Sequence, residues 1–422
     1  MLLAVGLTAT AQDFDRYFED ATLRLDYIFA GNAKHQAIAV DELSRIPHWY
    51  GKHDRLAEVP VEGNGQIVVR DHRTQKVIYR NSFSTLFQEW LTYDEAKKPS
   101  EKSFENVFLV PYPKDSADVT IELKNNRREV TVSMTHTVAP HDILIRHIGE
   151  RSVTPYETLQ KAADPAHCIH IAYVAEGYKE AEMPTFIEDC RTAMEALFAR
   201  EPFKSLRQRF NIVAVKSPSV ESGTSEPSKG IWKNTALHSH FDTFYSDRYL
   251  TTLHLKDLHD WLAGTPYEHI IVLVNTEKYG GGGILNSYNL SMAHHAYFKP
   301  VVVHEFGHSF AGLGDEYAYD QEQISMYPTD VEPWEPNLTT LVDFHGKWEK
   351  LIDKTTPQPS DLDKPNARRD KWKVGAYEPA GYSQHGVYRA FPDCRMRTNT
   401  HPEFCPACRL GLTKLIKFYT GE

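Results

Sequence analysis

The first third of the chain alternates apolar and polar residues in short runs that are separated by polar turns. Such alternation is typical of strands with one buried face and one polar face. The runs predict strands at 66–71, 77–80, 107–110, 119–123, 129–134 and 142–145. Short strands joined by turns favour an antiparallel β-sandwich, which we place at residues 12–150.

The pattern changes beyond residue 165, where continuous apolar runs alternate with longer amphipathic stretches. The runs at 168–174, 210–215 and 269–274 predict buried strands, and the stretches at 183–198, 250–262, 300–313 and 410–418 predict helices. Strands that alternate with helices indicate a mostly parallel, twisted sheet covered by helices. We therefore expect a chain of mixed α+β and α/β class, with a polar connector at 151–164 and a second domain at 165–422.

The first eleven residues differ from both domains. Residues 1–7 form a short apolar run, and residues 9–11 have the Ala-x-Ala form of a signal-peptidase site, although a basic start is missing. This pattern predicts a signal peptide at 1–11 and a secreted or periplasmic protein. No later segment has the ~18 apolar residues that a membrane span needs, so we expect no membrane-spanning segment.

Composition narrows the range of functions. The chain is 41% hydrophobic and 25% charged, which is typical of a folded protein and argues against long disordered segments. Its formal net charge is −10, and acidic and basic residues are mixed along its length. Because nucleic-acid binding needs a basic surface, we expect no nucleic-acid partner.

The predicted helix at 300–313 carries the residues with the clearest chemistry. His304 and His308 are four positions apart, so a helix places both imidazoles on one face. Two such imidazoles can bind one zinc ion at ~2.0–2.1 Å each. Glu305 lies beside the first histidine, where a carboxylate can take a proton from a water that the zinc acidifies. This combination indicates a metallopeptidase.

A third ligand is expected just beyond this helix. Gly312 and Gly314 allow a sharp turn after His308, and Asp315 follows directly. Two imidazoles and one carboxylate leave a fourth zinc position open, as a catalytic site requires. Glu316 is the nearest alternative to Asp315, and the spacing favours Asp315 only modestly.

The stretch 304–317, HEFGHSFAGLGDEY, resembles the signature of the IgA-peptidase-like metallopeptidases, a metzincin-type group of zinc enzymes. Further stretches that match this family are 176–178, 201–203, 222–224, 247–250 and 279–283. The resemblance extends over roughly 165–422, and the β-rich first part is similar to the domain that often precedes it. The resemblance implies zinc, with His304, His308 and Asp315 as ligands and Glu305 as general base.

Metzincins also have a methionine turn beneath the zinc. Met326 and Met396 are the two candidates, and the resemblance favours Met396, which is followed by the predicted C-terminal helix. General metzincins place the third ligand six residues after the second histidine, where this chain has Gly314. Asp315 is one residue further on, so the turn between His308 and Asp315 must differ.

Two other features of the site are less specific. In metzincins the strand before the zinc helix is a sheet edge that pairs with the substrate, and 280–283 occupies that place as four glycines. A flexible loop explains these glycines nearly as well. Tyr382 and Tyr388 are candidate donors to the oxyanion of the reaction, although most tyrosines simply pack.

The chain has five cysteines, three of which lie near its end. Cys394, His401, Cys405 and Cys408 could form a second, structural zinc site, because Cys405 and Cys408 have the Cys-x-x-Cys spacing. The spacing alone favours a disulfide or buried thiols over this second ion.

Together these features predict a secreted zinc endopeptidase that acts on protein or peptide substrates. Two alternatives remain open. In the first, the zinc domain is inactive and the protein is a binding or adhesion module, which an intact H-E-x-x-H argues against. In the second, the protein is a zinc amidase that acts on cell-wall peptides.

Overall fold

The computed structural model describes residues 11–318, 326–361 and 372–422. The apolar run and most of the cleavage pattern that predict a signal peptide therefore lie outside the described residues. Among the residues that are described, no helix is both long and apolar enough to cross a membrane.

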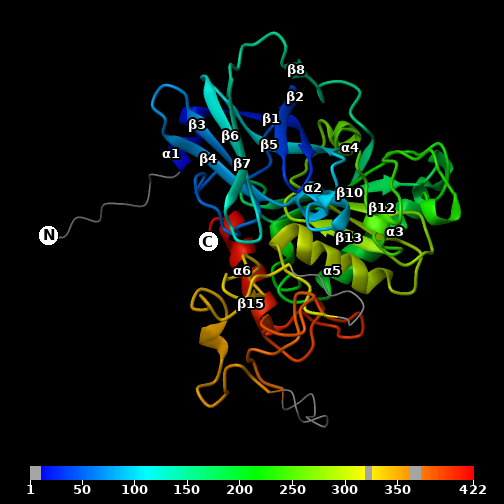
Figure 1. Cartoon of the computed structure of the whole chain (residues 1–422). Helices are drawn as coiled ribbons and strands as arrows, with labels where there is room; N and C mark the ends of the chain where they lie inside the picture. Colours follow the sequence, from blue (N-terminus) through cyan, green and yellow to red (C-terminus); the bar gives the residue numbers. More distant parts are fainter. Residues whose placement is uncertain (1–10, 319–325, 362–371) are drawn as a thin grey trace.

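The first part of the chain forms two four-stranded sheets (Figure 1). One has the order β5-β1-β2-β8, with β1 Phe18–Gly31, β2 Gln36–Pro47, β5 Lys102–Pro113 and β8 Arg146–His147. The other has the order β4-β3-β6-β7, with β3 Gly65–Asp71, β4 Val77–Phe83, β6 Ala117–Lys124 and β7 Val130–Val138. All neighbours are antiparallel except β2 and β8. Two short helices, α1 Ala11–Tyr17 and α2 Leu86–Trp90, flank these strands.

The expected two-sheet arrangement is present, because buried side chains of both sheets belong to one core. The strand predicted at 142–145 is wrong: this segment is a turn, and Ile143 and Leu144 are 95% and 78% exposed. The long strand β1 escaped prediction, since Arg24 and Asp26 interrupt its apolar pattern. Both are buried, and the Arg24 guanidinium binds both oxygens of the Asp26 carboxylate.

The second part contains a six-stranded sheet in the order β13-β14-β12-β10-β11-β9. Its strands are β9 Tyr156–Gln160, β10 Ile169–Glu176, β11 Phe210–Val215, β12 His269–Val274, β13 Gly281–Ile284 and β14 Tyr288–Met292. The four inner strands run parallel, as predicted, and the edge strands β9 and β13 run antiparallel to their neighbours. The expected connector at 151–164 is therefore wrong in part, because its centre forms β9.

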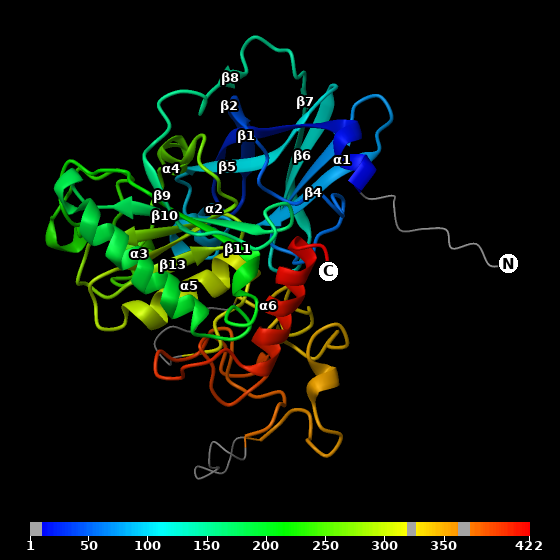
Figure 2. The same ribbon diagram turned by 180° about the vertical axis from the view of Figure 1, so that it is seen from behind.

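Three of the four longer helices cover one face of this sheet (Figure 2). The four are α3 Met183–Phe198, α4 Leu255–Leu262, α5 Phe298–Ala311 and α6 Pro406–Tyr419. Helices α3, α5 and α6 share a core with one face of the sheet, whereas α4 and the N-terminal sheets share a core with the other face. The helix predicted from residue 250 begins only at Leu255, since Thr251 pairs with His240.

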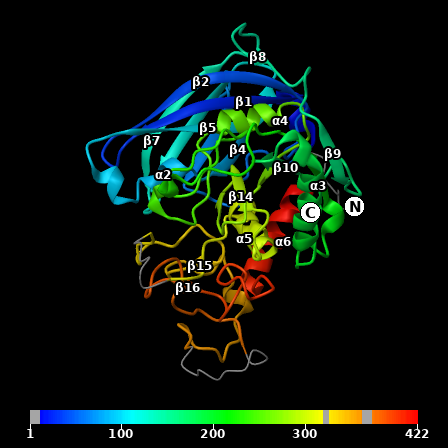
Figure 3. The same cartoon turned by 90° about the vertical axis from the view of Figure 1, so that its right-hand side faces the viewer.

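Most of the remaining chain, between α5 and α6, is irregular where the structure describes it. It contains the short strands β15 Leu338–Thr339 and β16 Tyr388–Arg389 and the single turn η6 Glu349–Leu351. Other single turns are η1 Asp94–Lys97, η2 Glu180–Glu182, η3 Arg207–Arg209, η4 Pro227–Lys229 and η5 Thr243–Tyr245. Figure 3 shows the segment between α5 and α6 beside these two helices, away from the N-terminal sheets.

Candidate active site

Helix α5 brings the two predicted histidines together. The Nε2 atoms of His304 and His308 lie 3.0 Å apart. Their Nδ1 atoms lie 3.0 Å and 2.5 Å from the carbonyl oxygens of Arg395 and Leu313. A carbonyl can only accept, so both Nδ1 atoms donate, and in the neutral rings both Nε2 lone pairs face the same point. This is the tautomer that a metal ligand needs.

Asp315 completes the set. Its Oδ1 lies 3.1 Å from Nε2 of His304 and 3.3 Å from Nε2 of His308. Burial disfavours a charged imidazole, but the Asp315 carboxylate outweighs this effect and raises the pKa of His308 to about 9. The carboxylate is thus a strong partner for a positive charge between the three side chains.

The turn that delivers Asp315 depends on glycine, as expected. Gly312 ends α5 with φ +59°, and its N–H donates to the carbonyls of the last turn. Asn337 then fixes the next residue, Gly314: its Oδ1 accepts the Gly314 N–H at 2.7 Å and its Nδ2 donates to the Gly314 carbonyl at 2.8 Å. Nothing in the sequence pattern indicated this role of Asn337.

The three side chains fit a zinc ion. A tetrahedral zinc bound at ~2.0–2.1 Å separates its ligand atoms by about 3.3 Å, close to the observed 3.0–3.3 Å. Asp315 Oδ1 is buried and accepts no hydrogen bond from the residues the structure describes. The side chains of His304, His308 and Asp315 remain 13%, 16% and 9% exposed, so an ion there is reachable from solvent.

Glu305 lies beside these side chains, and its carboxylate oxygen belongs to the same group of possible metal-binding atoms as those of the two histidines. Burial raises its pKa, an effect that the nearby imidazoles oppose. Its carboxylate lies against Gly281, where an added Cβ would come within 2.7 Å of Oε1. Glycine at 281 therefore makes room for Glu305.

The sheet edge that we expected to pair with substrate already bonds in part to another segment of the chain. Strand β13 is an edge of the sheet, but the Gly281 N–H bonds to the Arg248 carbonyl and the Gly281 carbonyl accepts from the Leu250 N–H, each at 3.3 Å. The prediction of a free edge is therefore wrong at Gly281.

Of the two candidate methionines, Met396 lies against α5. It is fully buried, and a Cβ added at Gly307 would meet its Sδ at 2.8 Å. Its loop also holds the carbonyl of Arg395 that orients His304. Met326, by contrast, is partly exposed in the irregular segment. The packing therefore agrees with the preference for Met396.

The two candidate tyrosines differ. The Tyr382 hydroxyl donates to Oδ2 of Asp315, so in this structure it orients the Asp315 carboxylate. Tyr388 lies in β16, where it pairs with Thr339 of β15. The sequence indicated the residue Tyr382 but not this contact with Asp315.

Glu316, the alternative third ligand, points elsewhere. Its Oε1 lies 3.2 Å from Sγ of Cys408 and accepts from Asn337 Nδ2 at 2.9 Å. The predicted second cluster therefore contains Glu316 in place of His401. The inclusion of His401 was wrong, because its ring nitrogens are not among the ligand atoms that converge there; its Nδ1 lies 2.9 Å from the carbonyl of Glu403.

Helix α2 and the residue after β4 bring the N-terminal part of the chain to the site, which the sequence did not indicate. Glu89 of α2 accepts a hydrogen bond from the Tyr249 hydroxyl at 2.5 Å and interacts electrostatically with Asp315 and Glu305. Burial raises the pKa of Glu89 to about 7. Nearby, the Ser84 N–H donates to the carbonyl of Leu285, just after β13, at 3.1 Å.

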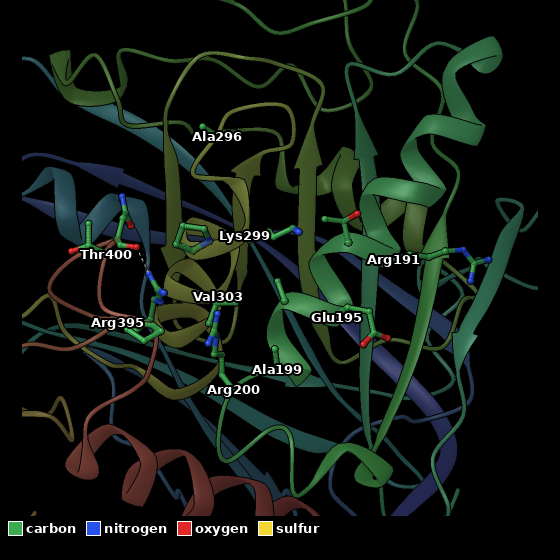
Figure 4. Close-up of a pocket in the computed structure, with 14 residues that line it drawn as sticks. Arg191, Glu195, Ala199, Arg200, Ala296, Lys299, Val303, Arg395 and Thr400 are labelled. Atoms are coloured by element: carbon green, nitrogen blue, oxygen red, sulfur yellow. Dashed lines mark hydrogen bonds between the residues drawn. The ribbon is translucent and has the colours of Figure 1, made fainter.

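A separate groove lies between α3, α5 and the loop at 395–402 (Figure 4). Its volume is 740 Å³, and basic side chains including Arg191, Arg200 and Lys299 line it. Its lining includes Val303 and Arg395, but not the two histidines of α5, Glu305 or Asp315, so it is separate from the candidate site.

Comparison with known families agrees with this geometry. The family model described as IgA Peptidase M64 matches residues 158–372, and the model described as Peptidase M64 N-terminus matches residues 13–135. A search of curated proteins found no match. The first match spans half of the chain and includes all of α5 and Asp315. The chain therefore belongs to the IgA peptidase M64 family.

Proposed function

We propose that this protein is an exported zinc-dependent endopeptidase of metzincin type, in which His304, His308 and Asp315 hold the catalytic ion. The observation that carries this proposal is the convergence of two Nε2 atoms and one carboxylate oxygen at 3.0–3.3 Å. Membership of a metallopeptidase family supports it, as does the packing of Met396 beneath α5. The substrate is a protein or peptide.

A bound zinc ion would supply Lewis acidity at the open position of this site. The residues of the chain would transfer the proton and orient the ligands. Glu305 accepts a proton from the attacking water and returns it to the leaving amine. The carbonyls of Arg395 and Leu313 keep the imidazoles oriented, and Tyr382 keeps Asp315 oriented. The raised pKa of Glu305 suits a group that both accepts and gives up a proton.

Glu305→Gln tests the general base. We expect this variant to retain zinc and to lose hydrolysis of a peptide library by at least ~10²-fold. Asp315→Ala should instead lower zinc content. Full activity of Glu305→Gln would contradict the mechanism, and unchanged zinc in Asp315→Ala would contradict the ligand assignment.

Chelation separates the proposed peptidase from the alternatives. Removal of zinc should abolish cleavage of general peptides, and added zinc should restore it. A fully zinc-loaded protein that cleaves nothing would indicate a binding module, and cleavage restricted to cell-wall peptides would indicate an amidase. Export rests on the sequence of residues 1–11 alone. It predicts a mature N-terminus at Gln12, which N-terminal sequencing of the exported protein measures.

A further inference from the structure

A second group of metal-type ligands lies next to the catalytic site in the chain. It consists of Glu316, Cys394, Cys405 and Cys408, whose ligand atoms all lie within 4.8 Å of one another. All four side chains are completely or almost completely buried. Glu316 directly follows Asp315, and Cys405 and Cys408 lie at the start of α6, where Cys405 caps the helix.

The spacing of these atoms is that of ligands around one ion. Sγ of Cys408 lies 3.7 Å from Sγ of Cys394 and 3.5 Å from Sγ of Cys405. Oε1 of Glu316 lies 3.2 Å from Sγ of Cys408 and 3.8 Å from Sγ of Cys405. A tetrahedral zinc with Zn–S bonds of ~2.3 Å and a Zn–O bond of ~2.0 Å separates sulfurs by about 3.8 Å and sulfur from oxygen by about 3.5 Å. A disulfide requires ~2.05 Å.

A buried carboxylate oxygen of Glu316 without a hydrogen-bond partner in the described part of the chain is a second, independent indication of a cation site. Oε2 of Glu316 is buried and has no hydrogen-bond partner among the residues the structure describes. A buried carboxylate oxygen without a partner is costly. A divalent ion bound by the carboxylate would remove this cost.

Backbone N–H groups point at the sulfurs of Cys394 and Cys405. Sγ of Cys394 accepts hydrogen bonds from the N–H groups of Cys405, at 3.1 Å, and Met396, at 3.5 Å. Sγ of Cys405 accepts from the N–H of Cys408 at 3.5 Å. These three bonds and the N-terminus of α6 would stabilise the negative sulfur of a metal-bound cysteine. The fully buried Arg389 interacts with Glu316 and Cys394 and offsets part of the added charge.

We propose that Glu316, Cys394, Cys405 and Cys408 bind a second zinc ion in a closed, four-coordinate structural site. This goes beyond the proposed peptidase activity, which uses none of these side chains. The ion ties three segments together. Glu316 anchors the loop of Asp315, Cys394 anchors the loop whose Arg395 carbonyl orients His304, and the last two cysteines anchor α6.

Metal analysis of the full chain tests the proposal. Protein loaded with zinc alone and then dialysed should hold about two ions per chain by mass spectrometry, and Cys408→Ser and Glu316→Gln should each hold about one. Glu316→Gln keeps the side-chain volume, so it remains informative if Cys408→Ser does not fold. Cys190→Ser, which removes a buried cysteine of α3 outside the cluster, should keep both ions.

Cobalt identifies which site is occupied. A His304→Ala and His308→Ala double variant loaded with cobalt should show the near-ultraviolet charge-transfer absorption of cobalt thiolates, and adding Cys408→Ser should remove it. No thiolate absorption in the cobalt-loaded protein, or fewer than five free thiols in denatured, unreduced protein, would each overturn the proposal, and so would one zinc per wild-type chain that Cys408→Ser does not remove. If the catalytic proposal fails instead, hydrolysis will not respond to the removal or addition of zinc, while the thiolate absorption will be intact.

Discussion

The hydroxyl of Tyr382 donates a hydrogen bond to Oδ2 of Asp315, while Oδ1 of the same carboxylate faces His304 and His308. Removing the hydroxyl should leave the carboxylate free to rotate. We expect Tyr382→Phe to weaken zinc binding about 10–100-fold, because partners of metal ligands typically contribute this much. Competition with a chromogenic chelator measures the affinity.

Tyr388→Phe is the matched control for this prediction, since Tyr388 lies in β16. It should bind zinc as the wild type does. Wild-type zinc affinity together with lost activity in Tyr382→Phe would assign the hydroxyl to the substrate instead of to Asp315.

Two glycines of β13 should respond differently to alanine. At Gly281 the new Cβ would come within 2.7 Å of Oε1 of Glu305, the end of a flexible side chain. The fold should survive, but the displaced carboxylate should lower kcat about 10–100-fold. At Gly283 the Cβ would come within 2.5 Å of the Glu305 carbonyl oxygen, so backbone must move and stability should fall.

Urea unfolding and peptide hydrolysis, measured on both variants, check this contrast. The expected pattern is lost activity with a near-normal midpoint for Gly281→Ala and a lowered midpoint for Gly283→Ala. Equal loss of stability in both would show that the space at Gly281 serves packing alone.

Met396 and Gly307 should be energetically coupled. An alanine Cβ at 307 would lie 2.8 Å from Sδ of Met396, so the thioether must shift despite the better helix propensity of alanine. We expect Gly307→Ala to destabilise the wild type but not Met396→Ala, which supplies room. A double-mutant cycle should give a coupling of about 1 kcal/mol or more. A coupling near zero would show that Met396 does not pack against Gly307 of the helix.

Acid should weaken the six-stranded sheet through His269. This side chain is buried in β12 against Phe310 and Tyr419. Burial lowers its pKa to about 3, whereas an unfolded histidine titrates near ~6.5. Between these values the unfolded chain binds a proton that the folded chain does not. The free energy of unfolding should therefore fall with decreasing pH, approaching about 1.4 kcal/mol per unit.

His269→Phe should flatten this dependence, which urea midpoints at pH 7 and pH 5 will show. The exposed His141 provides the control, and His141→Gln should keep the wild-type slope. An unchanged slope in His269→Phe would place the acid sensitivity elsewhere.

The convergence of His304 and His308 on α5 was predictable because it depends on a local spacing. His304, Glu305 and His308 share one turn, and the glycine that ends α5 is close to them in sequence. The contributions of Asn337 and Glu89 to the site, and the contact of Tyr382 with Asp315, were not predictable. Each of these residues reaches the site from a distant segment, and a single asparagine, tyrosine or glutamate has no spacing that marks it.

The fold was predictable where a strand carries only apolar residues. Strands β11 and β12 have the predicted bounds, since both faces are buried and the runs are continuous. Strand β1 was missed because it carries a buried ion pair that interrupts its apolar pattern. The segment at Ile143–Leu144 was wrongly predicted as a strand because its apolar residues are exposed. His401 has plausible ligand spacing, yet only the fold shows that Glu316 takes its place beside the cysteines.

The core that the six-stranded sheet shares with the N-terminal sheets determines how the molecule unfolds. Side chains such as Val174 and Val272 lie in the same cluster as Phe29 and Phe87 of the N-terminal part. Neither part can leave without exposing this apolar surface to water. The two family regions should therefore melt together in a calorimeter as one cooperative unit, and a peptidase expressed from residue 158 onward should aggregate.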